Sequence, residues 1–338
     1  MAFKVIRNNN QQSESDTHHQ EVDWEAYHNY MVKTADLEEP TVLTGYVSVI
    51  ADLGLQKMEP GKIEWNGTPE QEAEELEKRP DNWFEDGVDH KGNKKRYRMW
   101  NQKDTQCVAL AVDIPDIMVN KGQFFGDDTA GEKPVRLWLG GDFFTKESGM
   151  IVARPIPLKH RNIADSGKAV WSLDKKHSLY KMASAAKLLD SQSAFTADRI
   201  DELLGKSFQF ECQIFMKEGK NGKKYYTENI KFTGGLARGQ KPCTDLPTTP
   251  YLIQFDDNND SEALKELRSH VVNTMKRASN WEESIIKKEL EAVRPSQDNS
   301  PAKEESPKKD TKPPKQEKPN KPVANQNDDD EDSSSCPF

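Results

Sequence analysis

The feature that most constrains the fold is the segment KSFQFECQIFMKEGKNGKKYYTENIKFTGG at residues 206–235. Apolar and polar side chains alternate on both sides of Asn221-Gly222. This dipeptide favours two-residue hairpin turns because both residues tolerate a positive φ. Successive side chains of a strand point to opposite faces, so a period of two indicates a strand with two different faces. The segment therefore predicts a β-hairpin from about Ser207 to Phe232.

The two faces of this hairpin differ in character. The even positions are apolar and predict a core face: Phe208, Phe210, Cys212, Ile214, Ile230 and Phe232. The odd positions combine cations, rings and polar groups: Phe215, Lys217, Lys223, Tyr225, Thr227, Asn229 and Lys231. Single-stranded nucleic acid binds such surfaces, because cations neutralise phosphates and bases stack on rings. The alternative is an ordinary solvated strand face with Tyr225 half buried.

Other segments predict a mainly β fold. Runs rich in β-branched or apolar residues predict further strands at 41–50, 107–119, 133–141 and 149–158. The first of these is expected to end in a turn at Asp52-Leu-Gly54. A helical spacing of apolar residues between 175 and 190 predicts a helical insert. The fold class predicted is an OB-fold-like small β-barrel with this insert, a C-terminal helix and a disordered acidic tail. A different small barrel or sandwich would show a similar pattern.

Composition divides the chain into parts. The predicted parts are a mobile N-terminal arm with a short helix (1–35), an OB-fold-like binding domain (36–255) with an acidic and then basic insert (about 66–104), a C-terminal helical segment (256–294), a disordered linker (295–327) and an acidic partner-binding tail (328–338). A second short helix is expected at 69–79. In the C-terminal segment, Leu264, Leu267, Val271, Met275 and Ala278 form one apolar stripe. We expect this helix to pack on the barrel; the alternative is a homo-oligomer contact. A capping-box pattern, Ser279 with Glu282, predicts that another helix starts there.

The sequence also excludes several classes of protein. It has neither the apolar run of a signal peptide nor one long enough to span a membrane, so we expect a soluble, cytoplasmic protein without membrane contact. The four cysteines form no CxxC pair, which argues against a zinc site or a disulfide framework. LGKS at residues 204–207 is no phosphate loop, because Ile200 stands where the first glycine belongs. We predict no cofactor, no metal and no enzymatic activity. An enzyme whose residues assemble only in three dimensions stays a third alternative.

The net charge of −9 says nothing about where the charges lie. Basic residues interleave with aromatic ones in RYRMW and VRLWLGG as well as in the hairpin, while acids concentrate in other segments. The predicted base-stacking residues are Trp100, Trp138, Phe215 and Tyr225. The predicted phosphate-binding residues are Lys94, Lys95, Arg96, Arg98, Arg136, Arg154, Lys159, Arg161, Lys217, Lys223 and Lys231.

Three features together resemble a known family. They are GYVSVIADLGLQ, the strand LLGKSFQFECQIF leading into YYTENIKFTGG, and a polar linker with an acidic tip. The chain resembles bacteriophage single-stranded DNA-binding proteins built on an oligonucleotide-binding barrel. Its last residues, Cys336-Pro337-Phe338, are similar to the tail of bacterial single-stranded DNA-binding proteins, although Ser333–Ser335 separate them from the acids.

The resemblance implies non-catalytic coating of exposed DNA strands during replication, recombination and repair, in the cytoplasm of a host bacterium. It also implies that the tail recruits replication proteins such as a polymerase, a helicase or primase, or recombination factors. The tail residues concerned are Asp328, Asp329, Asp330, Glu331, Asp332, Pro337 and Phe338. A terminal ring with its carboxylate suits an apolar pocket beside a basic residue. The alternative function is a protein-interaction adaptor or an RNA-binding module that uses the same barrel and tail.

Overall fold

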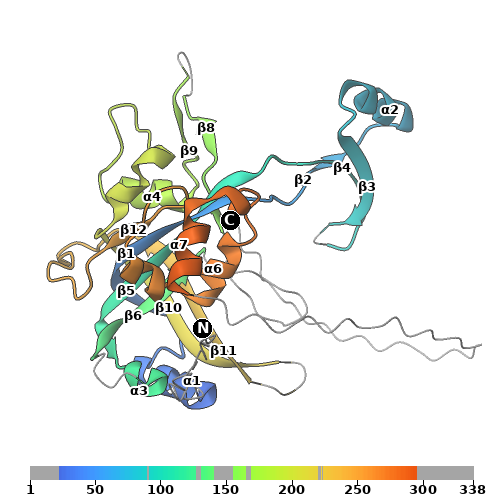
Figure 1. Ribbon diagram of the computed structural model, residues 1–338. Helices are drawn as coiled ribbons and strands as arrows, with labels where there is room; N and C mark the ends of the chain where they lie inside the picture. The colour runs from blue at the N-terminus through green and yellow to red at the C-terminus, as the bar shows by residue number, and fades with distance from the viewer. Residues whose placement is uncertain are drawn as a thin grey trace, which may run out of the picture.

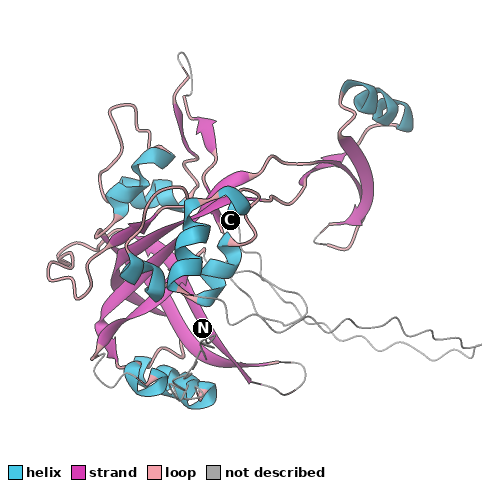
Figure 2. Ribbon diagram, viewed as in Figure 1, coloured by secondary structure: helices cyan, strands magenta, loops and turns pink. Residues whose placement is uncertain are grey.

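The computed structural model describes residues 23–89, 91–126, 131–140, 155–164, 169–219, 222 and 224–294. The fold is mainly β, with one seven-stranded sheet and smaller sheets of three and two strands (Figures 1 and 2). The large sheet follows the order β11-β10-β1-β5-β6. These strands are β1 (Thr41–Gln56), β5 (Thr105–Val119), β6 (Lys133–Leu139), β10 (Ser207–Glu218) and β11 (Lys224–Gly234). Two short strands extend the sheet, β7 (Ile156–Pro157) beside β5 and β12 (Tyr251–Ile253) beside β1.

The strand order is that of an oligonucleotide-binding barrel. Taken along the chain, the first strand β1 pairs with the second, β5, and with the fourth, β10. The third strand β6 pairs with β5, and the fifth, β11, pairs with β10. Strands β6 and β11 contact each other without a ladder between them among the described residues, so the barrel stays partly open. The order in which the strands pair therefore confirms the OB-fold-like prediction.

The predicted hairpin is present with the predicted faces. Its two strands pair from Gln209 opposite Gly234 to Glu218 opposite Lys224, and Gly222 in the connection has φ +71°. On the inner face, the even-numbered residues of β10 from Phe208 to Ile214 are at most 1% exposed. Burial of this face fixes the register, because a shift by one residue would turn the apolar side chains outward.

The expected turn at 52–54 is wrong, since β1 runs on through it to Gln56. The register between β1 and β5 shifts between Asp52 and Leu55, which is a β-bulge. Gly54 adopts φ +72° there, and a Cβ on it would lie 2.5 Å from Cζ of Phe255. The glycine that suggested a turn is needed for the bulge and for the close approach of this ring.

Helices and a small hairpin surround the barrel. They are α1 (Trp24–Ala35), α3 (Gly122–Phe125), β8 (His160–Asn162), β9 (Trp171–Leu173), α4 (Ser178–Ala185) and the 3-10 helix η1 (Ala197–Leu203). The helical insert between β6 and β10 is therefore confirmed, in a shorter form than predicted. Asp23 caps α1, its Oδ1 accepting a hydrogen bond from Ala26 N at 2.9 Å.

The C-terminal segment packs on the outward face of the sheet (Figure 1). It comprises α5 (Ser261–Glu266), α6 (Ser269–Met275), the 3-10 helix η2 (Trp281–Glu283) and α7 (Ile285–Val293). All five residues of the predicted stripe are buried, in a core shared with Val49, Ala51, Ala109 and Ala111 of β1 and β5. The expected packing on the barrel is confirmed.

One detail of this segment differs from the prediction. Ser279 forms no cap, because its Oγ donates a hydrogen bond to Leu55 O at 3.2 Å. The last helix begins after Ser284 instead, whose Oγ accepts from Lys287 N.

No helix in the described ranges combines the length and apolar character that a membrane span requires.

The insert between β1 and β5 is a folded arm that projects from the barrel (Figure 1). It comprises β2 (Gly61–Trp65), α2 (Pro69–Lys78), β3 (Asn82–Val88) and β4 (Lys94–Trp100). The strands form a separate sheet in the order β2-β4-β3. The short helix predicted at 69–79 is confirmed, and the insert as a whole carries more structure than its composition indicated.

Candidate nucleic-acid interface

The outer face of the β10–β11 hairpin carries four of the predicted residues. Lys217 lies directly opposite Tyr225, and Phe215 lies opposite Thr227. Lys217 and Lys231 are exposed, while the two rings are half-buried. Residues opposite each other on an antiparallel pair lie within contact distance, so each ring has polar or cationic neighbours. The hairpin thus presents rings and ammonium groups on one accessible face.

A second set gathers at the base of the arm, where an open hollow of about 680 Å³ lies between β4 and the segment that leads into β8. Trp100 lines it together with Lys159 and Arg161, and these three were predicted as binding residues from separate stretches of sequence. Lys103 and His160 also line it, and Asp104 is the one acid among its lining residues. The hollow therefore has more basic than acidic side chains around a tryptophan, and Arg161, which is 70% exposed, also pairs with Asp174 at 3.1 Å.

The position of Trp100 follows from the arm strands. Gly61 of β2 lies opposite Trp100 of β4, and a Cβ on Gly61 would come within 2.1 Å of the indole Cε2. The ring therefore lies flat against a strand that has no side chain at that point. On the other side of the hollow, Lys159 Nζ donates a hydrogen bond to Gln102 Oε1 at 2.5 Å. Strand pairing thus positions the ring, and a hydrogen bond to the Gln102 side chain in the loop after β4 positions one cation.

Trp138 is not a stacking platform, so this prediction is wrong. Its side chain is 5% exposed and belongs to the core beneath the C-terminal helices, edge-on to His270 at 6.4 Å between ring centroids. The second and third strands of OB barrels commonly supply the ligand face. Here the outward side of β5 and β6 is covered by α5 to α7, so a ring on that face is buried.

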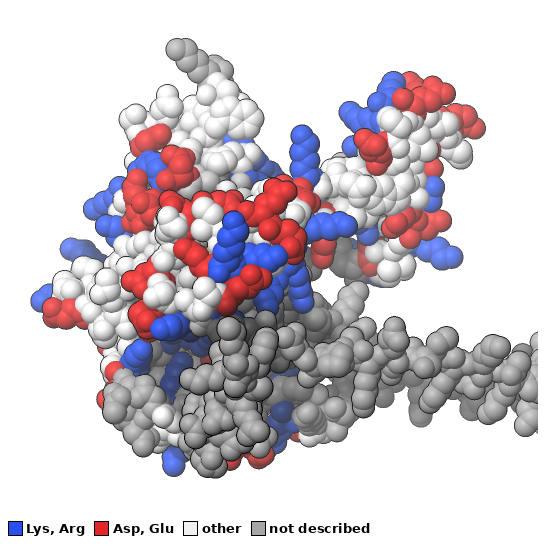
Figure 3. Space-filling model, viewed as in Figure 1, with Lys and Arg blue, Asp and Glu red and all other residues white. Residues whose placement is uncertain are grey.

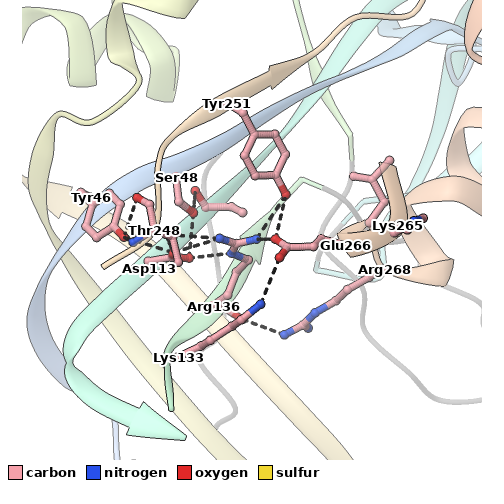
Figure 4. Close-up of polar contacts among 12 residues, drawn as sticks. Tyr46, Ser48, Asp113, Lys133, Arg136, Thr248, Tyr251, Lys265, Glu266 and Arg268 are labelled. Atoms are coloured by element: carbon pink, nitrogen blue, oxygen red, sulfur yellow. Dashed lines mark hydrogen bonds and ion pairs between the residues drawn. The ribbon is translucent and has the colours of Figure 1, made fainter. Parts of the chain in front are cut away.

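Arg136 is also unavailable to phosphates, which corrects a second prediction. Its guanidinium donates to both oxygens of the fully buried Asp113, at 2.7 and 3.0 Å, and to Glu266 of α5 at 3.1 Å (Figure 4). Asp113 also accepts from Ser48 Oγ at 2.7 Å and from Thr248 Oγ1 at 2.5 Å. With its oxygens occupied by donors, this carboxylate ties strands β1, β5 and β6 to the segment around Thr248.

The basic strand of the arm is not free either. Arg96 forms two hydrogen bonds with Glu72 of α2, both 2.9 Å, and Arg98 is paired with Glu75. Lys95 pairs with Glu64 at 2.6 Å, and Lys94 is exposed. Acidic and basic side chains therefore intermix on the arm (Figure 3), contrary to the expected segregation. Of the predicted phosphate contacts on this strand, Lys94 alone projects freely, so the prediction is wrong for the two arginines in this arrangement.

Two of the predicted cations, Arg154 and Lys223, and all the predicted tail residues lie outside the described residues. Three exposed rings were not predicted: Trp171 of β9 is 62% exposed, Trp24 is 55% exposed and Phe125 is 48% exposed. Trp24 and Phe125 contact each other at 5.8 Å between centroids. Trp171 lies opposite Asn162 in the β8–β9 hairpin and is not among the residues that line the hollow. Because Arg161 pairs with Ser172, the side chains of Trp171 and Arg161 lie on opposite faces of this hairpin. The strand that carries Trp171 is three residues long, too short for a period-two pattern to show which way the ring points.

Neither a metal site among the described residues nor a matching protein adds a further binding residue to this set. Within the described ranges, no group of three or more His, Cys, Asp or Glu side chains is arranged to hold a metal ion. Comparison of the chain with protein-family models, curated proteins and solved structures finds no match. The candidate interface therefore consists of the basic hollow with Trp100 and the outer face of the β10–β11 hairpin, and Trp171 is a further exposed ring on the β8–β9 hairpin.

Proposed function

We propose that the protein binds single-stranded DNA with little regard to sequence and without catalysis, coating exposed strands during phage DNA replication and recombination. The hollow at the base of the arm carries this proposal. It joins Trp100 to Lys159 and Arg161, which are separated by about sixty residues in sequence, around a space with one acidic side chain. Bases stacking on a ring contribute about 1 to 3 kcal/mol each without discriminating sequence, and phosphates bind the cations.

The hairpin supports the same function independently. Lys217 and Lys231 stand in solvent on the face that also carries Phe215 and Tyr225. In OB barrels, the loop between the fourth and fifth strands and the loop between the first and second commonly hold oligonucleotides. In this chain these loops correspond to the β10–β11 connection and the arm; the hairpin face adjoins the first, and Trp100 of the hollow belongs to the second. We assign recruitment of replication proteins to residues 328–338 because their sequence resembles the tail of bacterial single-stranded DNA-binding proteins.

Fluorescence titration with oligothymidylate over a salt series tests the proposal. We expect tight binding at low salt, quenching of tryptophan emission, and steep weakening as salt rises because counterions are released. Lys159→Ala with Arg161→Ala should weaken binding and reduce the slope of log K against log salt by about two. The control is Lys276→Ala with Lys288→Ala, which removes the same charge from exposed positions at the C-cap of α6 and on α7.

Three outcomes would contradict the proposal: no binding at low salt, equal affinity for duplex and single strand, or equal effects of the two double variants. Titration with RNA separates an RNA-binding module from a DNA-binding one. Binding of another protein with no quenching by any oligonucleotide would favour the adaptor alternative, because bases that stack on Trp100 must change its emission.

A further inference from the structure

Helix α2 packs against the arm sheet through carboxylates. None of its ten residues is buried, and Glu72 and Glu75 alone are half-buried. These two are the residues that meet Arg96 and Arg98 of β4. A helix that belongs to a folded core covers its sheet with an apolar stripe. The contact between α2 and the sheet is therefore mainly ionic.

The helix also keeps its shape through its own contacts. Thr68 and Gln71 form a capping box, with Thr68 N donating to Gln71 Oε1 at 2.9 Å and Thr68 Oγ1 accepting from Gln71 N. Pro69 occupies the first turn, and Lys78 pairs with Glu74 at 2.5 Å one turn apart. These local contacts remain when the helix moves away from the sheet.

Beneath α2, the arm sheet presents rings and guanidinium groups on one face. The register places Trp65 and Asp86 opposite Arg96, and Phe84 opposite Arg98. Arg96 lies 5.7 Å from the centroid of Phe84, Arg98 lies 5.6 Å from that of Trp100, and Trp65 meets Phe84 edge-on at 5.1 Å. We call Trp65, Phe84, Arg96, Arg98 and Trp100 the concealed face. A single-strand binding surface combines rings and guanidinium groups in this way. The same face carries one carboxylate, Asp86 of β3, which pairs with Arg96 at 3.1 Å.

Two donors of the concealed face have no acceptor. Trp65 Nε1 and Arg98 Nε are shielded from solvent and form no hydrogen bond within the described structure. A buried donor without a partner is unfavourable, and most buried donors in folded proteins are satisfied. The carboxylates of α2 therefore complete the concealed face only in part. Phosphate oxygens and base edges supply acceptors of the kind that is missing.

We propose that α2 is a displaceable lid, and that the phosphates of a single strand replace Glu72 and Glu75 on Arg96 and Arg98 while its bases stack on Trp65 and Phe84. This inference rests on the proposed function and extends its site, because Trp100 belongs to both the concealed face and the basic hollow. The two ion pairs are only partly shielded, at 36% and 20% exposed for Arg96–Glu72 and 20% and 14% for Arg98–Glu75, so salt weakens them. A phosphate offers each arginine an equivalent bidentate contact, and DNA binding in addition releases counterions, which favours the exchange.

The decisive variants differ only in which carboxylates of α2 they neutralise. Glu72→Gln with Glu75→Gln removes the charges that face the sheet. Glu74→Gln with Glu77→Gln is the matched control, since both of those side chains are exposed on the same helix. The affinity of the full chain for oligothymidylate should rise at least about threefold more in the first variant than in the control. The reason is that displacing α2 from the sheet then costs less free energy, so more of the binding free energy appears as affinity. Adding Arg96→Gln and Arg98→Gln to the first variant should abolish the gain.

Hydrogen exchange gives a second measurement on the unmodified protein. Saturating oligothymidylate should speed exchange of the α2 amides and slow exchange of the β4 amides if the helix leaves the sheet. Equal affinities of the two double variants, weaker binding by the first, or unchanged α2 exchange in saturated wild-type protein would overturn the lid while leaving DNA binding intact. Failure of the wild type and of every variant to bind oligothymidylate would instead overturn the proposed function.

Discussion

Arg268 and Glu228 form an ion pair, 2.5 Å between Nη1 and Oε2, that joins the C-terminal helices to strand β11. The same guanidinium donates to Arg136 O of β6 at 2.7 Å. Arg268 therefore bridges β6 and β11, the two barrel strands that contact each other without a ladder among the described residues. One side chain links the open edge of the barrel to the helices that cover its outward face.

Replacing Arg268 by methionine should lower the free energy of unfolding by about 2 to 3 kcal/mol, because it leaves the Glu228 carboxylate without its cation. Both side chains are mostly but not fully shielded, at 26% and 13% exposed, so solvent moderates the loss. Urea denaturation measures the change. Glu228→Leu combined with Arg268→Met should recover much of the stability, and a double variant as unstable as the single one would contradict this view of the pair.

Acid should weaken the same junction. Burial alone would raise the pKa of Glu228, but the charge of Arg268 and its hydrogen bonds bring this pKa below its ordinary value of 4.5. A carboxylate with a lowered pKa in the folded state stabilises the protein above about pH 4.5, and this contribution is lost as the pH falls through the lowered value. The melting temperature should therefore fall below about pH 4.5, and Glu228→Gln should reduce the steepness of that fall. An unchanged pH profile in the variant would show that other carboxyls control acid stability.

Trp171 should contribute to DNA binding without contributing to the core. Its ring is 62% exposed on the hairpin that also carries Arg161 of the hollow, so Trp171→Ala should weaken oligothymidylate binding about fivefold or more, the loss of one stacked base. The melting temperature of the Trp171→Ala variant should stay within about one degree of that of the wild type, because surface substitutions change stability little. Trp138→Phe is the complementary control: it alters a buried ring, so it should lower stability and leave the quenching of emission by DNA unchanged.

Removing residues 328–338 should raise affinity for single-stranded DNA, most strongly at low salt. Acidic side chains tethered to the domain compete with phosphates for its cations at a high effective concentration, and salt screens that competition. Binding of replication proteins should be lost in the shortened chain. Titration of both chains over a salt series checks the first expectation, and affinities that coincide at every salt would contradict it.

Local patterns predicted the hairpin well because its two faces are set by alternation within one segment. The same reasoning failed for Trp138, whose burial depends on helices more than a hundred residues further along the chain. It also gave no sign that Arg96 is paired with Glu72, because this pairing requires the arm to fold back on itself. The sequence identified Trp100 and Lys159 separately as binding residues, but it contained no pattern to indicate that both line the same hollow. Burial by distant elements and ion pairing across strands are tertiary effects that a short window of sequence does not contain.

The arm leaves and re-enters the barrel at adjacent positions, because Gln56 at the end of β1 pairs with Thr105 at the start of β5. A tight turn between these two residues would close the same ladder at a small entropic cost. The pairing of β1 with β5 therefore does not depend on the length or sequence of the segment inserted between these two residues. The arm can therefore be lengthened, shortened or replaced by a turn while the pairing register of the barrel strands is preserved.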